Sequence, residues 1–387
     1  MKHVLGLILI GLLVACGGTG TSGSGGSNIR IGSVMSETGT IAYYGLADLS
    51  GIQLAVKEMA ADGGFLVGGK RYQFVMDQQD FASQASQALV ATQKLIDEDQ
   101  VKFLFGPDVT AGWVPAWGTI QKAGIINFTS ATPARGYLGQ ATASGLFYVL
   151  PSPEFRTNAL IKAAVAVMHP STAALLIPND AVGNSFKPLF EKALQANNVK
   201  VVYDTLVDPA AKDLSAPLSA AKAAHPDVLV GGAYLDGTFG PILTQAVQLG
   251  VTKNFIPMIG VSEAPMKQLG HGVDSYITTV STLNLVGPTD DAAKTYVSSY
   301  QKYLGSTPDN AAAPGVGYHD AVWMLAAAMS AASTTTDIAK IAAAMKQVTS
   351  YPHANLSMTF DSSGQVSYPQ TVSVYQGSTG TFTYQRA

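Results

Sequence analysis

Short apolar runs alternate with longer segments of helical periodicity through most of the chain. The run IRIGSVM (29–35) has the composition of a buried strand, and the stretch at about 45–61 repeats apolar residues at the 3-4-3 spacing of a helix. Further strand-like runs follow at 72–76, 101–105 and 124–128, with helical segments between them. This alternation predicts a parallel sheet with helices on both of its faces.

The same alternation begins again near residue 147. The strand-like runs of this second half lie at 147–150, 173–177, 200–206, 227–233, 254–260 and 275–280. Three more helices are expected, at about 290–304, 316–332 and 336–348. The tail (356–385) differs, because its apolar-polar alternation interrupted by DSSG and GSTG predicts an antiparallel meander. The pattern therefore predicts two α/β halves, each with four or five strands.

Loops that follow strands are where a function is expected in this architecture. In open parallel sheets, ligands bind at the carboxyl ends of the strands, and two lobes that face each other form a cleft between them. Candidate binding residues are therefore expected in the strand-end loops of both halves.

The N-terminal segment is typical of a targeting signal. Its apolar run, residues 4–14, is shorter than the roughly 20 residues that a membrane-spanning helix needs, and it has the length of a secretory signal core. The four residues that end at Cys16 (LVAC) resemble the bacterial lipobox, in which the signal is cut before the cysteine and the thiol receives a diacylglycerol. We expect a signal peptide at 1–15 and a lipid-anchored, flexible Gly/Ser linker at 16–27. The alternative is an ordinary signal with a chance cysteine.

Composition excludes several classes of function. Of the 387 residues, 47% are hydrophobic and only 13% are charged, and the formal net charge of −3 with no basic run argues against a nucleic-acid partner. A single cysteine excludes an intrachain disulfide and a thiolate zinc cluster. No other apolar run is long enough to span a membrane, so the rest of the chain is expected to be soluble and to lie outside the cytoplasm. We also expect a monomer.

Motifs for catalysis and cofactors are incomplete. GFLVGGKR (64–71) lacks the Ser or Thr that follows Lys in a phosphate-binding loop, and it leads from a helix into a strand. PGVGYHD (314–320) has Asp where a dinucleotide fold needs a third Gly. The six histidines have no metal-ligand spacing, and no G-x-S-x-G motif occurs. We therefore expect no enzyme activity, no cofactor and no metal.

Four segments resemble one known family in their order and spacing. IGSVMSETGTIAYYG (31–45) and the segment 51–80 are similar to that family's first strand, helix and second strand, and KFLFGPDVTAG (102–112) and AGIINFTSATP (123–133) to its next two strands and loops. The family is the leucine/isoleucine/valine-binding family of extracytoplasmic solute-binding proteins of ABC transporters. The resemblance implies two doubly wound parallel-sheet lobes, joined by a three-strand hinge, with a ligand cleft between them.

The family fold also implies where the lobes begin and end. Hinge crossings are expected near 148–150, 281–285 and 353–358. The implied lobes are 28–148 plus 285–352 for lobe 1, and 149–284 plus 353–387 for lobe 2.

The resemblance implies a ligand site in the strand-end loops. Its residues are Tyr44, Thr110, Ser130, Ala131, Thr132, Tyr234 and Glu263. Hydroxyl and backbone groups of Thr110 and the 130–132 loop would meet a ligand carboxylate, the tyrosines would form aromatic walls, and Glu263 would meet an ammonium. A zwitterionic amino acid needs such partners, because each charge is costly to bury without charge-assisted hydrogen bonds.

Each assignment has a structural alternative. The hydroxyls of Thr110 and the 130–132 loop also suit loops or helix caps. Tyr44 suits packing within its lobe, Tyr234 suits a strand end, and Glu263 suits the first turn of a helix.

Four further residues affect the ligand class. Asp108 is a possible second acid facing the ligand, and Trp113 is bulky enough to enter the side-chain pocket. Val182 stands where the family often has an aromatic residue, and Arg156 lies several residues beyond the position of a common arginine. The ligand is therefore expected to be an α-amino acid, and these departures leave open whether it is leucine, isoleucine, valine or a related one.

The sequence thus predicts a lipid-anchored binding protein that closes over a small amino acid and then docks on an ABC permease in the membrane. One alternative on the same fold is a binder of an amide, urea or an aromatic acid. Another is a sensing ectodomain that works with a separate signalling partner.

Overall fold

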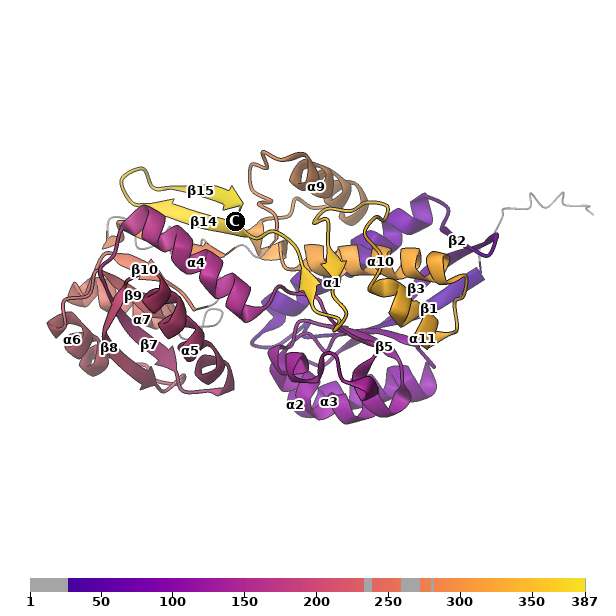
Figure 1. The fold of residues 1–387 in the computed structure, drawn as a ribbon, viewed down its shortest axis with the longest axis horizontal. Helices are drawn as coiled ribbons and strands as arrows, with labels where there is room; N and C mark the ends of the chain where they lie inside the picture. The colour runs from indigo at the N-terminus through magenta and orange to yellow at the C-terminus, as the bar shows by residue number, and fades with distance from the viewer. Residues whose placement is uncertain (1–26, 233–238, 259–271, 280–281, 387) are drawn as a thin grey trace, which may run out of the picture.

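The structure, a computed structural model, describes residues 27–232, 239–258, 272–279 and 282–386. These residues form two α/β lobes that lie side by side (Figure 1). Each lobe is built on its own sheet, and parallel pairing predominates in both sheets. The predicted fold class, two α/β lobes with helices around parallel sheets, is confirmed.

The first sheet has the strand order β2-β3-β1-β4-β5-β6. Its strands are β1 (Ser27–Met35), β2 (Phe65–Val67), β3 (Lys70–Asp80), β4 (Phe103–Phe105), β5 (Ile126–Thr129) and β6 (Leu146–Tyr148). Only the short edge strand β2, which the sequence pattern did not predict, pairs antiparallel in the described part of this sheet. The central strands β4 and β5 are buried on both sides, as expected for a sheet that is covered by helices on both faces.

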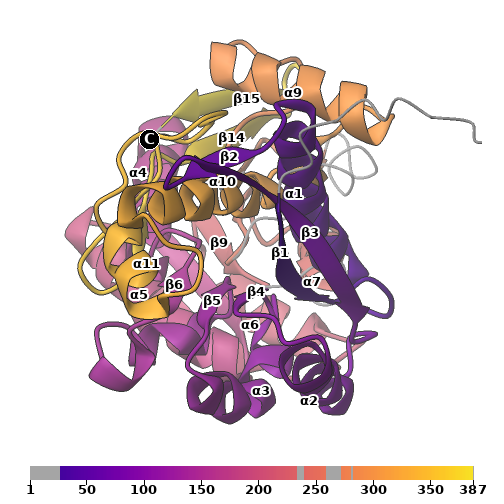
Figure 2. The ribbon, with the colours of Figure 1, turned by 90° about the vertical axis from the view of Figure 1, so that its right-hand side faces the viewer.

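Helices cover both faces of the first sheet (Figure 2). The helices of this lobe are α1 (Ala42–Ala61), α2 (Ala85–Gln93), α3 (Thr110–Ala123), α9 (Asp291–Leu304), α10 (Gly315–Ala332) and α11 (Ile338–Met345). Phe105 packs into the core under α1 and α10, whereas its neighbour Leu104 packs under α2 and α3. This alternation follows from the two-residue period of a strand.

The second sheet has the strand order β15-β14-β11-β10-β9-β7-β8. Its strands are β7 (Thr172–Pro178), β8 (Lys200–Val207), β9 (Val228–Gly231), β10 (Asn254–Ile256), β11 (Ser275–Thr279), β14 (Thr371–Gln376) and β15 (Thr381–Arg386). Its helices are α4 (Pro153–Met168), α5 (Ala181–Ala196), α6 (Ser215–Ala223) and α7 (Phe239–Leu249). Leu175 packs under α4 and α5, and Leu176 under α6 and α7.

The tail forms two antiparallel hairpins that belong to different lobes. The hairpin of β12 (Thr359–Phe360) and β13 (Val366–Ser367) packs on the first core, where Phe360 lies edge-on to Phe147 with ring centroids 5.0 Å apart. The hairpin of β14 and β15 extends the second sheet by antiparallel pairing with β11. The third passage between lobes therefore lies between Tyr368 and Val372, and not at the expected 353–358, because residues 356–368 bury their apolar side chains in the first core.

Candidate functional site

The loops after β1, β4 and β5 meet at one edge of the first sheet. These three strands are parallel neighbours, so their carboxyl ends lie together. Ser36 follows β1, Asp108 follows β4, and Ser130 follows β5. The edge therefore gathers polar groups from three segments that lie far apart in the sequence.

A tight turn brings the second of these loops against the first. Gly106 has φ of +90°, and a Cβ atom added to it would lie 2.1 Å from the carbonyl oxygen of Val34. Only glycine therefore fits at this position. The Gly106–Pro107 peptide bond is cis, and the turn places Asp108 beside Ser36.

Hydrogen bonds join the three loops to α10. The hydroxyl of Ser36 donates to Asp108 Oδ2 at 2.6 Å, and the hydroxyl of Ser130 donates to the carbonyl oxygen of Asp108 at 2.6 Å. The phenol oxygen of Tyr318 accepts the backbone N–H of Ser130 at 3.1 Å and lies 3.1 Å from its hydroxyl oxygen. All four side chains are buried or half-buried, so the network holds the loops in one arrangement.

Two carboxyl groups lie within this network. Asp48 on α1 is 3% exposed and Asp108 is 2% exposed. Burial raises the pKa of Asp108 to about 6, against hydrogen bonds from Ser36 that lower it. Burial, followed by the charge of Asp108, raises the pKa of Asp48 well above its usual value, and the Ser130 hydroxyl opposes this rise. At neutral pH the pair therefore favours a single negative charge, carried by Asp108.

Thr110 is the first residue of α3 and is half-buried beside this network. The sequence suggested that Trp113, in the next turn of α3, enters the ligand pocket. This prediction is wrong. The indole is 1% exposed, stacks on Trp117 with ring centroids 4.8 Å apart, and donates from Nε1 to Asn127 Oδ1 at 3.1 Å. Three residues beyond Thr110, the helix has turned this side chain into the core under the sheet.

The 130–132 loop has fewer backbone groups available to a ligand than the sequence suggested. The N–H of Ala131 donates to the hydroxyl of Thr129 at 3.0 Å, and its carbonyl oxygen accepts from the N–H of Ala134 at 3.0 Å. Both backbone groups of Ala131 are thus used within the loop. Thr132 begins a short 3₁₀ turn and is half-buried.

Tyr44 lies in the first turn of α1, half-buried, with its ring edge-on to that of Tyr43 at 5.7 Å between centroids. It is four residues before Asp48, so the two side chains share one face of the helix. Tyr44 therefore lies on the same side of α1 as Asp48 of the buried acid pair. Cys16, Tyr234 and Glu263 lie outside the described residues.

The second lobe contributes two of the residues singled out above. Val182, in the first turn of α5, packs against the core of the second lobe. The guanidinium of Arg156, in the first turn of α4, lies 5.7 Å from the ring centroid of Phe186, and its buried Nε has no hydrogen-bond partner. Arg156 therefore stacks on an aromatic ring of its own lobe.

Sequence analysis missed Asp48, Ser36 and Tyr318. One signal was present for Asp48, which is the single charged residue in the N-terminal half of α1. No local signal existed for Tyr318, because its partner Ser130 lies 188 residues earlier. Such contacts depend on how α1 and α10 cross.

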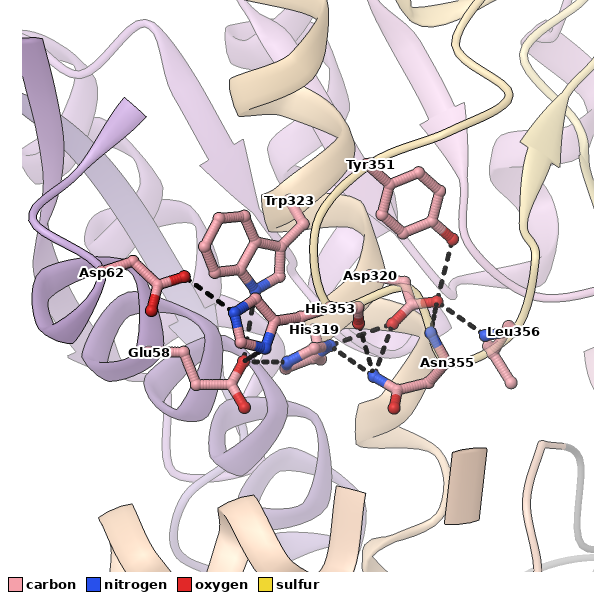
Figure 3. Close-up of polar contacts among 9 residues, drawn as sticks. All are labelled: Glu58, Asp62, His319, Asp320, Trp323, Tyr351, His353, Asn355 and Leu356. Atoms are coloured by element: carbon pink, nitrogen blue, oxygen red, sulfur yellow. Dashed lines mark hydrogen bonds and ion pairs between the residues drawn. The ribbon is translucent and has the colours of Figure 1, made fainter. Parts of the chain in front are cut away.

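A second polar cluster lies elsewhere in the first lobe (Figure 3). His319 is 1% exposed, with Nε2 at 2.7 Å from Glu58 Oε2 and Nδ1 at 2.9 Å from Asp320 Oδ1. Asp320 Oδ2 also accepts from the hydroxyl of Tyr351 and from the backbone N–H of Asn355. The cluster therefore ties α1 and α10 to the segment that leads into β12.

Chemically, this cluster is a buried ion network. Burial alone would lower the pKa of His319, but hydrogen bonds and charges from Asp320 and Glu58 raise it to about 9. His319 in turn lowers the pKa of Glu58. Both ring nitrogens face carboxylates, so the imidazolium donates on both sides and has no free nitrogen for proton transfer. The arrangement suits a structural role.

The part of the chain that the structure describes has neither a metal-binding cluster nor a membrane-spanning helix. No group of three or more His, Cys, Asp or Glu side chains is arranged to hold a metal ion there. Nor does any helix in the described ranges combine the length and apolarity needed to cross a membrane.

Comparison with known proteins identifies the family. The model of the periplasmic binding protein family matches residues 28–380, which is nearly the whole chain. This chain belongs to the periplasmic binding protein family. A curated relative is the Leu/Ile/Val-binding protein BraC3 of Rhizobium johnstonii, 25% identical over 359 residues, which cover 92% of this chain and 93% of the relative. Members of this family bind small solutes outside the cytoplasm, and these relatives are not enzymes.

Several solved structures share the fold of this chain. The branched-chain amino acid binding protein LivJ of Streptococcus pneumoniae, in complex with isoleucine, has a TM-score of 0.74 at 19% identity and covers 93% of this chain and 99% of its own. A solute-binding protein of Rhodopseudomonas palustris, in complex with 4-hydroxybenzoate, has a TM-score of 0.74 at 16% identity and covers 90% and 93%. The same fold thus accommodates an amino acid in one protein and an aromatic acid in another.

Proposed function

We propose that this chain is the extracytoplasmic solute-binding lipoprotein of an ABC importer, and that it captures a small amino acid between its lobes. The observation that carries the proposal is the alignment with a Leu/Ile/Val-binding protein over 92% of the chain. The strand-end loops of the first lobe support it, because Thr110 and Thr132 offer hydroxyls beside a buried acid. A permease would receive the solute when the loaded lobes close.

The proposed site combines both lobes. Tyr44, Thr110 and the 130–132 loop would line the first lobe, and Tyr234 and Glu263 the second. A closed cleft removes water from both charges of the ligand, so each needs a partner of opposite charge or a hydrogen-bond donor. Glu263 is proposed as the partner of the ammonium.

An aromatic acid is the second candidate ligand, since a protein of the same fold is known in complex with 4-hydroxybenzoate. A thermal-shift panel on the purified full chain in mild detergent separates the two. It contains leucine, isoleucine, valine, other amino acids, amides, benzoate and 4-hydroxybenzoate. A ligand at 100 times its Kd adds about 2.7 kcal/mol to the free energy of unfolding, which is easily measured.

We expect an amino acid to raise the melting temperature, and Glu263→Gln to weaken its binding by roughly 2–5 kcal/mol, the cost of removing a buried charge partner. Calorimetric titration measures the affinity. Glu98→Gln, at an exposed acid of the first lobe, is the matched control and should bind like the wild type. An unchanged affinity in Glu263→Gln removes Glu263 from the site, and a panel in which only non-amino compounds bind contradicts the amino-acid proposal.

A further inference from the structure

The buried acids of the first lobe lie directly behind the proposed ligand loops. Asp108 is two residues before Thr110, and its carbonyl oxygen accepts the hydroxyl of Ser130 at 2.6 Å. Asp48 is close enough to Asp108 and Ser130 for each of them to shift its pKa. A ligand held by Thr110 and the 130–132 loop would therefore bind within the electric field of these two carboxyl groups.

The negative charge of this pair is not neutralised locally. Within the described residues, neither acid forms an ion pair with Lys, Arg or His. Asp108 Oδ2 accepts from Ser36, whereas Oδ1 is buried and has no hydrogen-bond partner. Buried carboxylates ordinarily have counter-charges or full hydrogen bonding, so one unpartnered oxygen beside a ligand loop is a place for a donor.

Donors for an incoming anion at the same place are confined to the edge of the network. The N–H and hydroxyl of Ser130 are engaged with Tyr318 and with the Asp108 carbonyl, and the N–H of Ala131 is engaged with Thr129. The remaining side-chain donors of these loops are the hydroxyls of Thr110 and Thr132. The first-turn N–H groups of α3, which begins at Thr110, are donors as well. This wall can therefore hold one carboxylate at the end of α3, while the buried acids behind it favour positive charge.

We propose that the Asp48–Asp108 pair selects the charge of the ligand: the cleft admits a solute that carries an ammonium or similar donor group beside its carboxylate, and rejects acids whose only charge is negative. This inference rests on the proposed function and narrows it. Rejection arises because a monoanion brings a second negative charge into the closed cleft with nothing to offset Asp108. An ammonium adds a favourable interaction with the same carboxylate.

Calorimetric titration of the full chain with a matched pair of ligands tests this inference. Leucine and 4-methylpentanoate have the same side chain and carboxylate, and differ only in the amino group; benzoate and 4-hydroxybenzoate complete the set. In the wild type, we expect leucine to bind at least 100-fold more tightly than 4-methylpentanoate and the two benzoates. If another amino acid binds best, it replaces leucine, and its own deamino analogue replaces 4-methylpentanoate. Asp108→Asn should reduce this ratio at least tenfold.

Two variants control the result. Asp48→Asn imitates a neutral acid and should reduce the ratio by less than Asp108→Asn does, because Asp108 carries the charge. Asp97→Asn removes an exposed acid of the same lobe and should leave the ratio unchanged.

Lowering the pH of the wild type serves where Asp108→Asn fails to fold. The groups that face Asp108 are Asp48 from α1, Tyr318 from α10 through Ser130, and the Ser36 hydroxyl. Since Asp108 gains a proton as pH falls through about 6, the ratio should fall between pH 8 and pH 5.5.

Three outcomes overturn the inference. The first is a wild type that binds benzoate or 4-methylpentanoate as tightly as its best amino acid, which leaves the binding-protein function intact. The second is a folded Asp108→Asn protein, or a wild type at low pH, that keeps the ratio within twofold. The third is a panel in which nothing binds, which overturns the proposed function as well.

Discussion

His319 shows how one residue connects two distant parts of the chain. Its ring lies between Glu58 of α1 and Asp320 of α10, and Asp320 receives hydrogen bonds from residues 351–356 (Figure 3). A buried imidazolium between two carboxylates is favourable only while all three groups keep their charges. The stability of the first lobe should therefore depend on the proton of His319.

The pKa of His319 in the folded protein, about 9, is above the ordinary value of 6.5. A group whose pKa is raised by folding contributes stability that is fully present below pH 6.5 and is lost as pH rises through 9. The free energy of unfolding should thus fall by up to about 3 kcal/mol across this window. Urea-induced unfolding at several pH values measures the slope.

The slope separates ionisation from packing. His319→Asn should have a lower free energy of unfolding at every pH. Between pH 6.5 and 9.5, however, its free energy of unfolding should fall much less than that of the wild type. His169→Asn is the control at a helix end with φ of +48°, a conformation that Asn tolerates, and it should keep the wild-type slope. A wild type whose stability is level across the window contradicts the charged state assigned to His319.

At the scale of elements, the crossing of α1 and α10 builds both polar clusters. The helices approach so closely that a Cβ atom on Gly51 would lie 1.8 Å from the carbonyl oxygen of Gly315, and one on Gly315 would lie 2.1 Å from that of Ala47. Two glycines facing each other permit this backbone contact. It brings Tyr318 to the loop that carries Ser130, and His319 to Glu58.

Gly51→Ala should therefore separate the two helices and lower the free energy of unfolding by about 1–3 kcal/mol, the usual cost of overpacking. Thermal unfolding measures the loss. Gly118→Ala is the matched control, because Gly118 is exposed in α3 and its added Cβ meets nothing within 4 Å; helix propensity should stabilise that variant by about 0.5–1 kcal/mol. Equal effects of the two substitutions would refute the close crossing.

At the scale of the whole molecule, three chain segments that pass between the lobes lie against one another. The hydroxyl of Thr371 donates to the carbonyl oxygen of Thr282 at 2.7 Å. The side chain of Gln365 donates to the carbonyl oxygen of Leu150 at 2.8 Å, and the hydroxyl of Tyr368 to that of Val149 at 3.4 Å. These hydrogen bonds hold the three segments together, as a hinge for the proposed closure of the lobes would require.

The sequence predicts a lipid anchor at Cys16 and a Gly/Ser linker at 16–27, whose last residue, Ser27, begins β1 in the structure. A lipid on Cys16 would hold the lobes near a permease and leave them free to turn.

Cys16→Ser should abolish lipid attachment, because the acceptor thiol is lost. Intact-mass measurement of the protein expressed in a bacterium, together with membrane fractionation, detects the lipid. Ser24→Ala in the same linker should leave the mass of the lipid unchanged. A wild-type protein with an unmodified Cys16 contradicts the anchor and favours an ordinary secretory signal.

Much of the fold was predictable because buried positions recur along the sequence with the period of a strand or a helix. The α/β alternation, the position of α1 and the restart after residue 147 all follow from repeats of two or 3.6 residues. The loops after β4 and β5 were also identifiable, since strand ends mark ligand edges in parallel sheets. Local pattern and strand polarity were sufficient for these features.

Only the tertiary structure decided which residues of those elements meet. The bulk of Trp113 and its place beside a strand-end loop suggested that it enters the side-chain pocket, but the fold turns it into the core. The periodicity of a helix reports that one face is buried, but not which element covers that face. The family resemblance implied that residues 353–387 belong to the second lobe, whereas the apolar side chains of 356–368 pack on the first. The pairing of Asp48 with Asp108, across 60 residues of sequence, depends on helix crossing and strand order, which are long-range properties that no local pattern records.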